Sequence, residues 1–166
     1  MSKDIVLLIN RSEITAGTRG ASLGPDAIFT AARKNQKSFF VKYPIEEIKE
    51  LNYLLDRPTE YKFAKRIDGL LDVYNSLNDK VSTLLLNHKF PLVLAADHGS
   101  AGGTLAGIKS AFPPKRIGII WIDAHADIHT PYTTPSGNIH GMPLATVLNE
   151  DNLPCKLNEL SEETIQ

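Results

Sequence analysis

Three short and uninterrupted apolar runs constrain the fold of this chain more than any other feature of its sequence. They cover residues 5–9, 91–96 and 117–122. Runs of this length, apolar on both faces, are typical of strands in a parallel sheet that helices cover on both sides. The sequence therefore predicts a three-layer α/β/α fold with a mainly parallel sheet, whose strands lie at about residues 4–9, 91–96 and 117–122.

The stretches between these runs carry the signals of helices. Gly24 is followed by a proline and an acid, which are favoured in the first turn of a helix. Apolar residues recur every three or four positions from about Glu60 to Asn87. We expect further helices around residues 102–111 and from Met142, whereas residues 39–55 fit a short strand followed by a short helix.

The composition excludes several classes of protein and partner. A length of 166 residues suits one domain, and a net charge of −1 provides no broad basic surface for nucleic acid. The first apolar run is too short for a signal-peptide core or a membrane span. The single cysteine, Cys155, has no partner for a disulfide within the chain. We therefore expect a cytoplasmic protein that binds neither nucleic acid nor membrane.

Polar residues with metal-binding side chains follow two of the predicted strands directly. Asp97 and His98 come after the run 91–96, and the segment Asp123–Asp127 comes after the run 117–122. Four of the five histidines lie between positions 98 and 140. Because ligands bind beyond the carboxyl ends of strands in open parallel sheets, this placement predicts a functional site at that edge.

The segment Asp123-Ala124-His125-Ala126-Asp127 alternates polar and small residues. In an extended backbone, alternate side chains point to the same side, so its two carboxylates and one imidazole would converge. Such a set suits a divalent cation such as manganese, and no thiolate favours zinc or an iron–sulfur cluster. His98 could supply a further nitrogen. The alternative is that these residues only cap helices and loops.

The sequence from Asp123 to Gly141 resembles the arginase signature of the ureohydrolase superfamily. Ala96-Asp97-His98 is similar to the family's first metal motif, and Gly24-Pro25 to its N-terminal glycine–proline motif. Relatives that cleave agmatine or formimidoylglutamate share the metal motif. They lack the Thr-Thr-x-Ser-Gly-Asn-x-His-Gly stretch that this chain carries from Thr133, so the resemblance favours arginase.

The resemblance implies manganese-dependent hydrolysis of the guanidinium group of L-arginine to ornithine and urea. It implies two Mn²⁺ ions per complete subunit, and we expect a homo-oligomer. The metal ligands would be His98, Asp123, His125 and Asp127. Catalytic roles would fall to Asp127 and to His140, which would transfer a proton. The substrate would be bound by His129, Thr134 and Ser136.

Departures from the family pattern qualify this assignment. The family usually has asparagine at the place of His129, where it contacts the α-carboxylate of the substrate. His129 either donates the same hydrogen bond to that carboxylate or lies outside the site as a loop residue. The family's later Ser-x-Asp-x-Asp metal motif does not occur before Gln166. We therefore expect residues 1–166 to form a single arginase-like domain that is incomplete at the C-terminus.

Two other functions are compatible with the sequence. One is a non-catalytic ureohydrolase-like module that binds metal weakly. The other is a related ureohydrolase that acts on a different guanidino or amidino compound. A substrate panel of arginine, agmatine and guanidino acids would separate the latter from an arginase.

Overall fold

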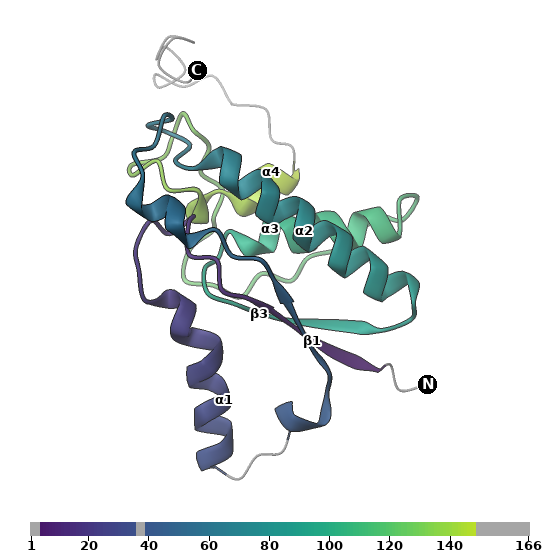
Figure 1. Ribbon diagram of the computed structural model, residues 1–166. Helices are drawn as coiled ribbons and strands as arrows, with labels where there is room; N and C mark the ends of the chain where they lie inside the picture. The colour runs from purple at the N-terminus through teal and green to yellow at the C-terminus, as the bar shows by residue number, and fades with distance from the viewer. Residues whose placement is uncertain (1–3, 36–38, 149–166) are drawn as a thin grey trace.

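The computed structural model describes residues 4–35 and 39–148, which form a parallel α/β structure (Figure 1). The sheet has the strand order β2-β1-β3, and both pairings are parallel. Its strands are β1 (Ile5–Asn10), β2 (Ile45–Ile48) and β3 (Phe90–Ala95). Leu7 of β1 lies opposite Ile45 on one side and Leu92 on the other. The central strand is buried from Val6 onward, as expected for a strand covered on both faces.

The described residues form four α-helices around the sheet: α1 (Gly24–Lys34), α2 (Ile67–Leu86), α3 (Ser100–Ala111) and α4 (Pro143–Leu148). Short 3₁₀-helices are η1 (Ala21–Leu23), η2 (Phe40–Lys42), η3 (Asn52–Asp56) and η4 (Ile139–Gly141). Helices α2, α3 and α4 lie on one side of the sheet and α1 on the other (Figure 1). No helix in the described part of the chain is long and apolar enough to cross a bilayer.

The core lies between the sheet and α2. Helix α2 buries one residue on each successive turn, including Leu70, Val73, Leu77 and Val81. This stripe packs against side chains of β1, β2 and the loop that follows β1, among them Leu8, Ile14 and Ile48. The three-to-four spacing seen in the sequence is therefore the face of α2 that turns toward the sheet.

Small residues let α3 approach α2 closely. A Cβ atom added at Gly103 would lie 2.9 Å from the Cβ of Leu77, and one added at Gly107 would lie 2.7 Å from the Cβ of Val81. These distances are too short for a real contact, so the two helices pack together only because both positions are glycine. This packing fixes α3, which begins two residues after His98.

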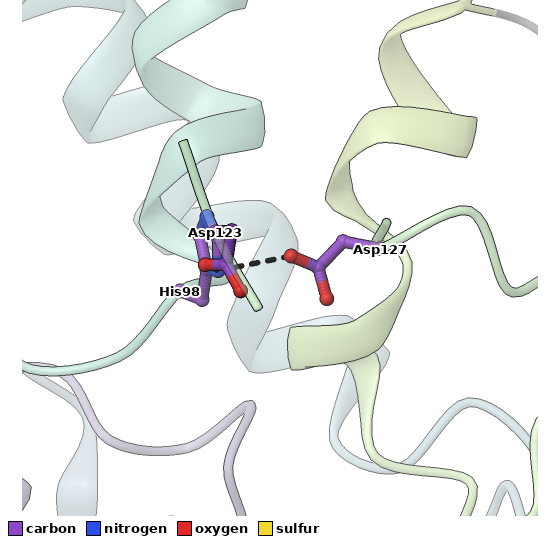
Figure 2. A group of neighbouring side chains, drawn as sticks. All are labelled: His98, Asp123 and Asp127. Atoms are coloured by element: carbon purple, nitrogen blue, oxygen red, sulfur yellow. Dashed lines mark ion pairs between the residues drawn. The ribbon is translucent and has the colours of Figure 1, made fainter. Parts of the chain in front are cut away.

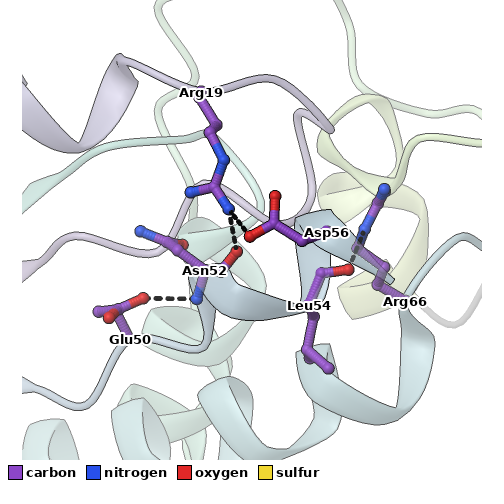
Figure 3. A network of polar contacts seen from close by, with 6 residues as sticks. All are labelled: Arg19, Glu50, Asn52, Leu54, Asp56 and Arg66. Atoms are coloured by element: carbon purple, nitrogen blue, oxygen red, sulfur yellow. Dashed lines mark hydrogen bonds and ion pairs between the residues drawn. The ribbon is translucent and has the colours of Figure 1, made fainter. Parts of the chain in front are cut away.

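The loop after β1 is tied to η3 by polar contacts. The Asn52 side chain accepts a hydrogen bond from the Glu13 N–H (2.9 Å) and donates one to the Arg11 carbonyl (2.8 Å). Arg19 donates to the Asn52 carbonyl (3.3 Å) and pairs with Asp56 (Figure 3). These contacts hold residues 11–19 in one place beside the carboxyl end of the sheet.

Most of the predicted elements are confirmed. The strands predicted at 4–9 and 91–96 are β1 and β3, each displaced by one residue, and they pair in parallel. Helices begin at Gly24 and near Met142, and the helix predicted at 102–111 begins two residues earlier. The prediction for residues 39–55 is wrong, because Phe40–Lys42 is a 3₁₀-helix and Ile45–Ile48 is the strand.

The prediction of a strand at residues 117–122 is also wrong for the described structure. This segment pairs with no other described strand, and Ile120 and Ile122 are 90% and 93% exposed. An apolar run has the tendency to form a strand, but the ladder hydrogen bonds that define one need a neighbouring backbone. No described backbone pairs with β3 on the side away from β1 either.

The close packing of α2 and α3 predicts whether a substitution at Gly107 raises or lowers the free energy of unfolding. Gly107→Ala should lower the free energy of unfolding by about 1–3 kcal/mol, because the added methyl group overpacks the contact with Val81. Helix propensity alone would predict a gain of about 1 kcal/mol. Gly118→Ala is the control, since its Cβ would meet nothing within 4 Å. Urea unfolding of the two variants measures the difference, and stabilisation by Gly107→Ala would contradict the packing.

Candidate functional site

Three side chains converge where β3 and the segment 117–122 end (Figure 2). The Nδ1 atom of His98 lies 3.0 Å from Oδ2 of Asp123 and 3.0 Å from Oδ2 of Asp127. The three ligand atoms all lie within 4.8 Å of one another. The carboxyl ends of the two segments therefore bring together residues that are up to 29 positions apart, from His98 to Asp127.

The chemistry of this cluster fits a divalent cation. A single Nδ1–H of His98 can serve only one of the two carboxylates at a time. Asp127 is 7% exposed, and among the described residues its Oδ2 atom contacts only the Nδ1 of His98, which Asp123 also contacts. A buried acceptor that must share its one donor is poorly satisfied, and two close carboxylates repel each other. A cation that accepts mixed oxygen and nitrogen ligands, such as Mn²⁺, would bind the buried oxygen and neutralise the repulsion between the carboxylates.

The backbone places Asp127 through an unusual conformation. Its φ angle is 51°, in the left-handed region that few non-glycine residues adopt. Its carbonyl oxygen accepts hydrogen bonds from the N–H groups of Leu144 (3.1 Å) and Ala145 (3.4 Å) in the first turn of α4. The start of α4 therefore holds the backbone of Asp127 while its side chain turns toward His98.

The two carboxylate oxygens of Asp123 face different histidines. Oδ2 faces His98, whereas Oδ1 accepts a hydrogen bond from the His125 N–H (2.8 Å). This backbone hydrogen bond holds the pKa of Asp123 below its ordinary value. The ring Nδ1 of His125 lies 3.5 Å from the same Oδ1.

The structure does not bring His125 into the three-residue cluster. The backbone bends at residues 123–125, so the extended geometry expected from the alternating sequence is wrong here. The His125 side chain is 82% exposed. Asp123 and Asp127 meet at His98 because of the bend and the left-handed turn, and not because of strand alternation.

Trp121 is a neighbour of the cluster that the sequence patterns did not indicate. Its ring stacks on the His98 imidazole, with centroids 4.8 Å apart and planes inclined by 12°. Stacking restricts the plane in which the imidazole can turn. The only sequence signal was that Trp121 is the one aromatic residue in the run before Asp123.

A cavity of about 270 Å³ adjoins the cluster through Asp127. All the residues expected on the substrate side line it: His129, Thr134, Ser136 and His140. His125 also lines this cavity. The structure thus gathers the substrate-side residues around one space next to the carboxylates.

The hydroxyl groups of Thr134 and Ser136 are oriented by backbone contacts. The oxygen of Thr134 accepts a hydrogen bond from the Gly137 N–H (3.0 Å), and that of Ser136 accepts one from the Asn138 N–H (3.2 Å). Because each oxygen accepts from the backbone, each hydroxyl proton is free to be donated elsewhere. Two such donors on one loop can bind an anionic group such as a carboxylate.

His129 lines the cavity and also contacts its own loop. Its Nδ1 atom lies 3.2 Å from the Thr133 hydroxyl oxygen, and its backbone N–H donates to the Gly141 carbonyl (3.1 Å). Its second ring nitrogen makes no hydrogen bond within the described part of the chain. Both roles considered for this residue, in substrate binding and in loop structure, are compatible with this position.

The pKa of Asp97, the acid next to His98, is shifted in the opposite direction to the pKa of Asp123. Burial raises the pKa of Asp97, although hydrogen bonds from the backbone N–H groups of Thr15 and Ala16 act against the increase. The site thus contains a buried carboxylate, Asp97, that lies outside the cluster.

Both a protein-family model and curated relatives identify this chain as similar to arginases. The model of the "Arginase family" matches residues 3–158. An arginase of Staphylococcus aureus (strain MSSA476) is 36% identical over 177 residues, covering 100% of this chain and 55% of the relative. Bacillus subtilis arginase is 35% identical over 148 residues, covering 89% of this chain and 49% of the relative. The chain thus spans about half the length of the curated relatives it matches.

Solved structures are similar over the same extent. The native structure of arginase from Bacillus caldovelox at pH 5.6 superposes with a TM-score of 0.73 at 31% identity, covering 90% of this chain and 50% of that chain. Entamoeba histolytica arginase in complex with L-ornithine also gives a TM-score of 0.73, at 29% identity, covering 87% of this chain and 50% of that chain.

The loop that carries Ser136 depends on the absence of a side chain at Gly137. Its φ angle is 74°, and an added Cβ would lie 1.9 Å from the Lys62 carbonyl oxygen. Gly137→Ala should therefore lower the free energy of unfolding by at least about 2 kcal/mol, through backbone strain and this clash. Gly118→Ala, whose Cβ would meet nothing within 4 Å, is the control. Equal urea midpoints for the two variants would show that the loop is not held as described.

Proposed function

The chain belongs to the arginase family, and from that premise we propose that its residues serve the manganese-dependent hydrolysis of L-arginine to ornithine and urea. The observation that carries the proposal is the position of the cluster His98, Asp123 and Asp127 beside a cavity lined by Thr134, Ser136 and His140. Side chains that can bind a cation and hydroxyl groups that can bind a carboxylate thus lie around the same cavity.

The residues that would hold manganese follow from the ligand atoms. His98 and Asp127 would bind one ion and His125 a second, while Asp123 would be shared because its two oxygens face the two histidines. When bound, the metal supplies a nucleophilic hydroxide at neutral pH, which a weakly electrophilic guanidinium carbon requires.

The other residues would bind the substrate and move a proton. The hydroxyl groups of Thr134 and Ser136 would donate hydrogen bonds to the α-carboxylate, since their oxygens already accept from the backbone. His140 lines the same cavity, and its imidazole would protonate the departing amine as a general acid. The guanidinium end would thereby point toward the carboxylates and the other end toward the loop 134–137.

A non-catalytic metal-binding module is the second candidate. It is favoured by the ligand count, because the cluster in the described residues has three members and His125 lies outside it. The two candidates differ in whether L-arginine is consumed, and both require that the cluster bind a metal ion.

Metal binding is testable in the chain itself. Asp127→Ala should weaken Mn²⁺ binding at least about tenfold, because it removes a buried member of the three-residue cluster. Asp72→Ala, which removes an exposed acid of α2, should leave binding unchanged. The electron paramagnetic resonance signal of free Mn²⁺ measures both affinities. Equal affinity of the Asp127 and Asp72 variants would contradict the assignment.

Residues 1–166 alone should show little or no arginase activity, even with excess manganese. Asp123 and Asp127 bring two negative charges against the four positive charges of two divalent ions, so the second ion would be weakly held. A urea assay on protein verified by intact mass tests this. Full turnover would mean that other ligands complete the site, with His129 the first to be examined.

The role of the loop hydroxyls can be tested in any active protein that contains these residues. Ser136→Ala should raise KM for L-arginine about tenfold and change kcat little, because the hydroxyl would bind the unreacting end of the substrate in ground and transition states alike. Ser110→Ala is the control, since it removes an exposed hydroxyl of α3 that does not line the cavity. Efficient hydrolysis of agmatine, which lacks the α-carboxylate, would contradict the role of Ser136.

A further inference from the structure

Asp97 is a buried carboxylate that the proposed chemistry does not use. It lies between β3 and His98 and is 9% exposed. Its Oδ2 atom accepts hydrogen bonds from the backbone N–H groups of Thr15 (2.9 Å) and Ala16 (3.2 Å). No ion pair involves Asp97 among the described residues. A buried charge without a cationic partner is costly, so it needs a structural reason.

The same two residues bind the loop on the other side of the cavity. The Thr15 carbonyl accepts a hydrogen bond from the His140 N–H (3.3 Å), and the Ala16 carbonyl accepts one from the Asn138 side chain (3.1 Å). The N–H groups of Thr15 and Ala16 therefore hold the residue next to His98, and their carbonyls hold the loop that carries Ser136 and His140.

Thr15 and Ala16 therefore form a bridge between Asp97 and the loop that carries Asn138 and His140. This bridge is tightly packed at both ends. A Cβ atom added at Gly99 would lie 2.4 Å from the Thr15 hydroxyl oxygen, and one added at Gly17 would lie 2.8 Å from Oδ1 of Asn138. The base of the bridge is fixed as well, because Glu13 is bound by Asn52 and accepts hydrogen bonds from Gly20 and Ser22. There is little room for the bridge to move independently of either end.

We propose that Asp97 is a positioning residue that acts through Thr15 and Ala16. It fixes the distance between His98 in the metal cluster and the loop that carries Ser136 and His140. The two ends of a bound substrate must reach both groups at once, so this distance sets which length of substrate fits. That consequence rests on the proposed function, whereas the bridge itself does not.

Site-resolved amide hydrogen exchange tests the bridge in the chain without metal. Asp97→Ala should accelerate exchange of the His140 N–H about tenfold, because its acceptor, the Thr15 carbonyl, is no longer held. Asp97→Asn keeps an acceptor oxygen and should restore most of the protection. Ser100→Ala is the matched control: it removes another buried hydrogen bond at the same strand end, the 2.7 Å contact with Asn10, without touching the bridge.

The same variants should differ in metal binding. Asp97→Ala should weaken Mn²⁺ binding about tenfold, as the loss of partners that orient ligands does in other metal sites. Ser100→Ala should stay within about twofold of the unmodified chain. If the unmodified chain binds no Mn²⁺, the proposed function is contradicted, while the exchange rates still decide the bridge.

Two results would overturn the proposal. One is an unchanged exchange rate at His140 in Asp97→Ala, and the other is an equal acceleration in Ser100→Ala, which would indicate general loosening of the strand end. If Asp97→Ala does not fold, the opposite end of the bridge supplies the test. Gly17→Ala should then accelerate exchange at His140 more than Gly20→Ala does, since Gly20 also has a positive φ but an added Cβ there meets nothing within 4 Å. Equal effects of these two variants would also contradict the bridge.

Discussion

The approach of two carboxylates to one imidazole is the interaction on which the rest of the site depends. Asp123 and Asp127 both place an oxygen 3.0 Å from the same nitrogen of His98, which can donate to only one of them. The surrounding structure holds this arrangement in place. The first turn of α4 binds the carbonyl of Asp127, Trp121 stacks on His98, and the His125 N–H orients Asp123. A divalent cation bound between them would remove the repulsion between the two carboxylates, which these contacts oppose.

The position of the cluster follows from the sheet. Parallel strands end at the same edge, and β3 delivers His98 there directly. The loop after β1 reaches the same edge and contacts both the cluster side and the substrate side of the cavity. The tight contact of α3 with α2 through Gly103 and Gly107 fixes the helix that follows His98. The fold thus supports the site from the central strand, the adjacent helix and the loop between β1 and α1.

The sequence was sufficient for the features that depend on local pattern. The apolar runs gave β1 and β3 to within one residue, and the short motif from Asp123 to Gly141 identified the residues that line the cavity. Features that depend on distant partners were wrong or missed. Strand β2 contains two glutamates and exists because it pairs with β1, whereas the apolar segment 117–122 has no described partner. The contact of Asp97 with Thr15 joins residues 82 positions apart and leaves no periodic signal in the sequence.

Anomalous diffraction at the manganese edge decides whether the cluster of His98, Asp123 and Asp127 is a metal site. Crystals of residues 1–166 soaked in Mn²⁺ should give an anomalous peak about 2.0–2.3 Å from His98 Nδ1 and from one oxygen each of Asp123 and Asp127. The metal assignment predicts this peak before any other, because no other group of three such ligands occurs in the described residues. A cluster without a peak, in a crystal that binds Mn²⁺ elsewhere such as at the exposed His88, would contradict it.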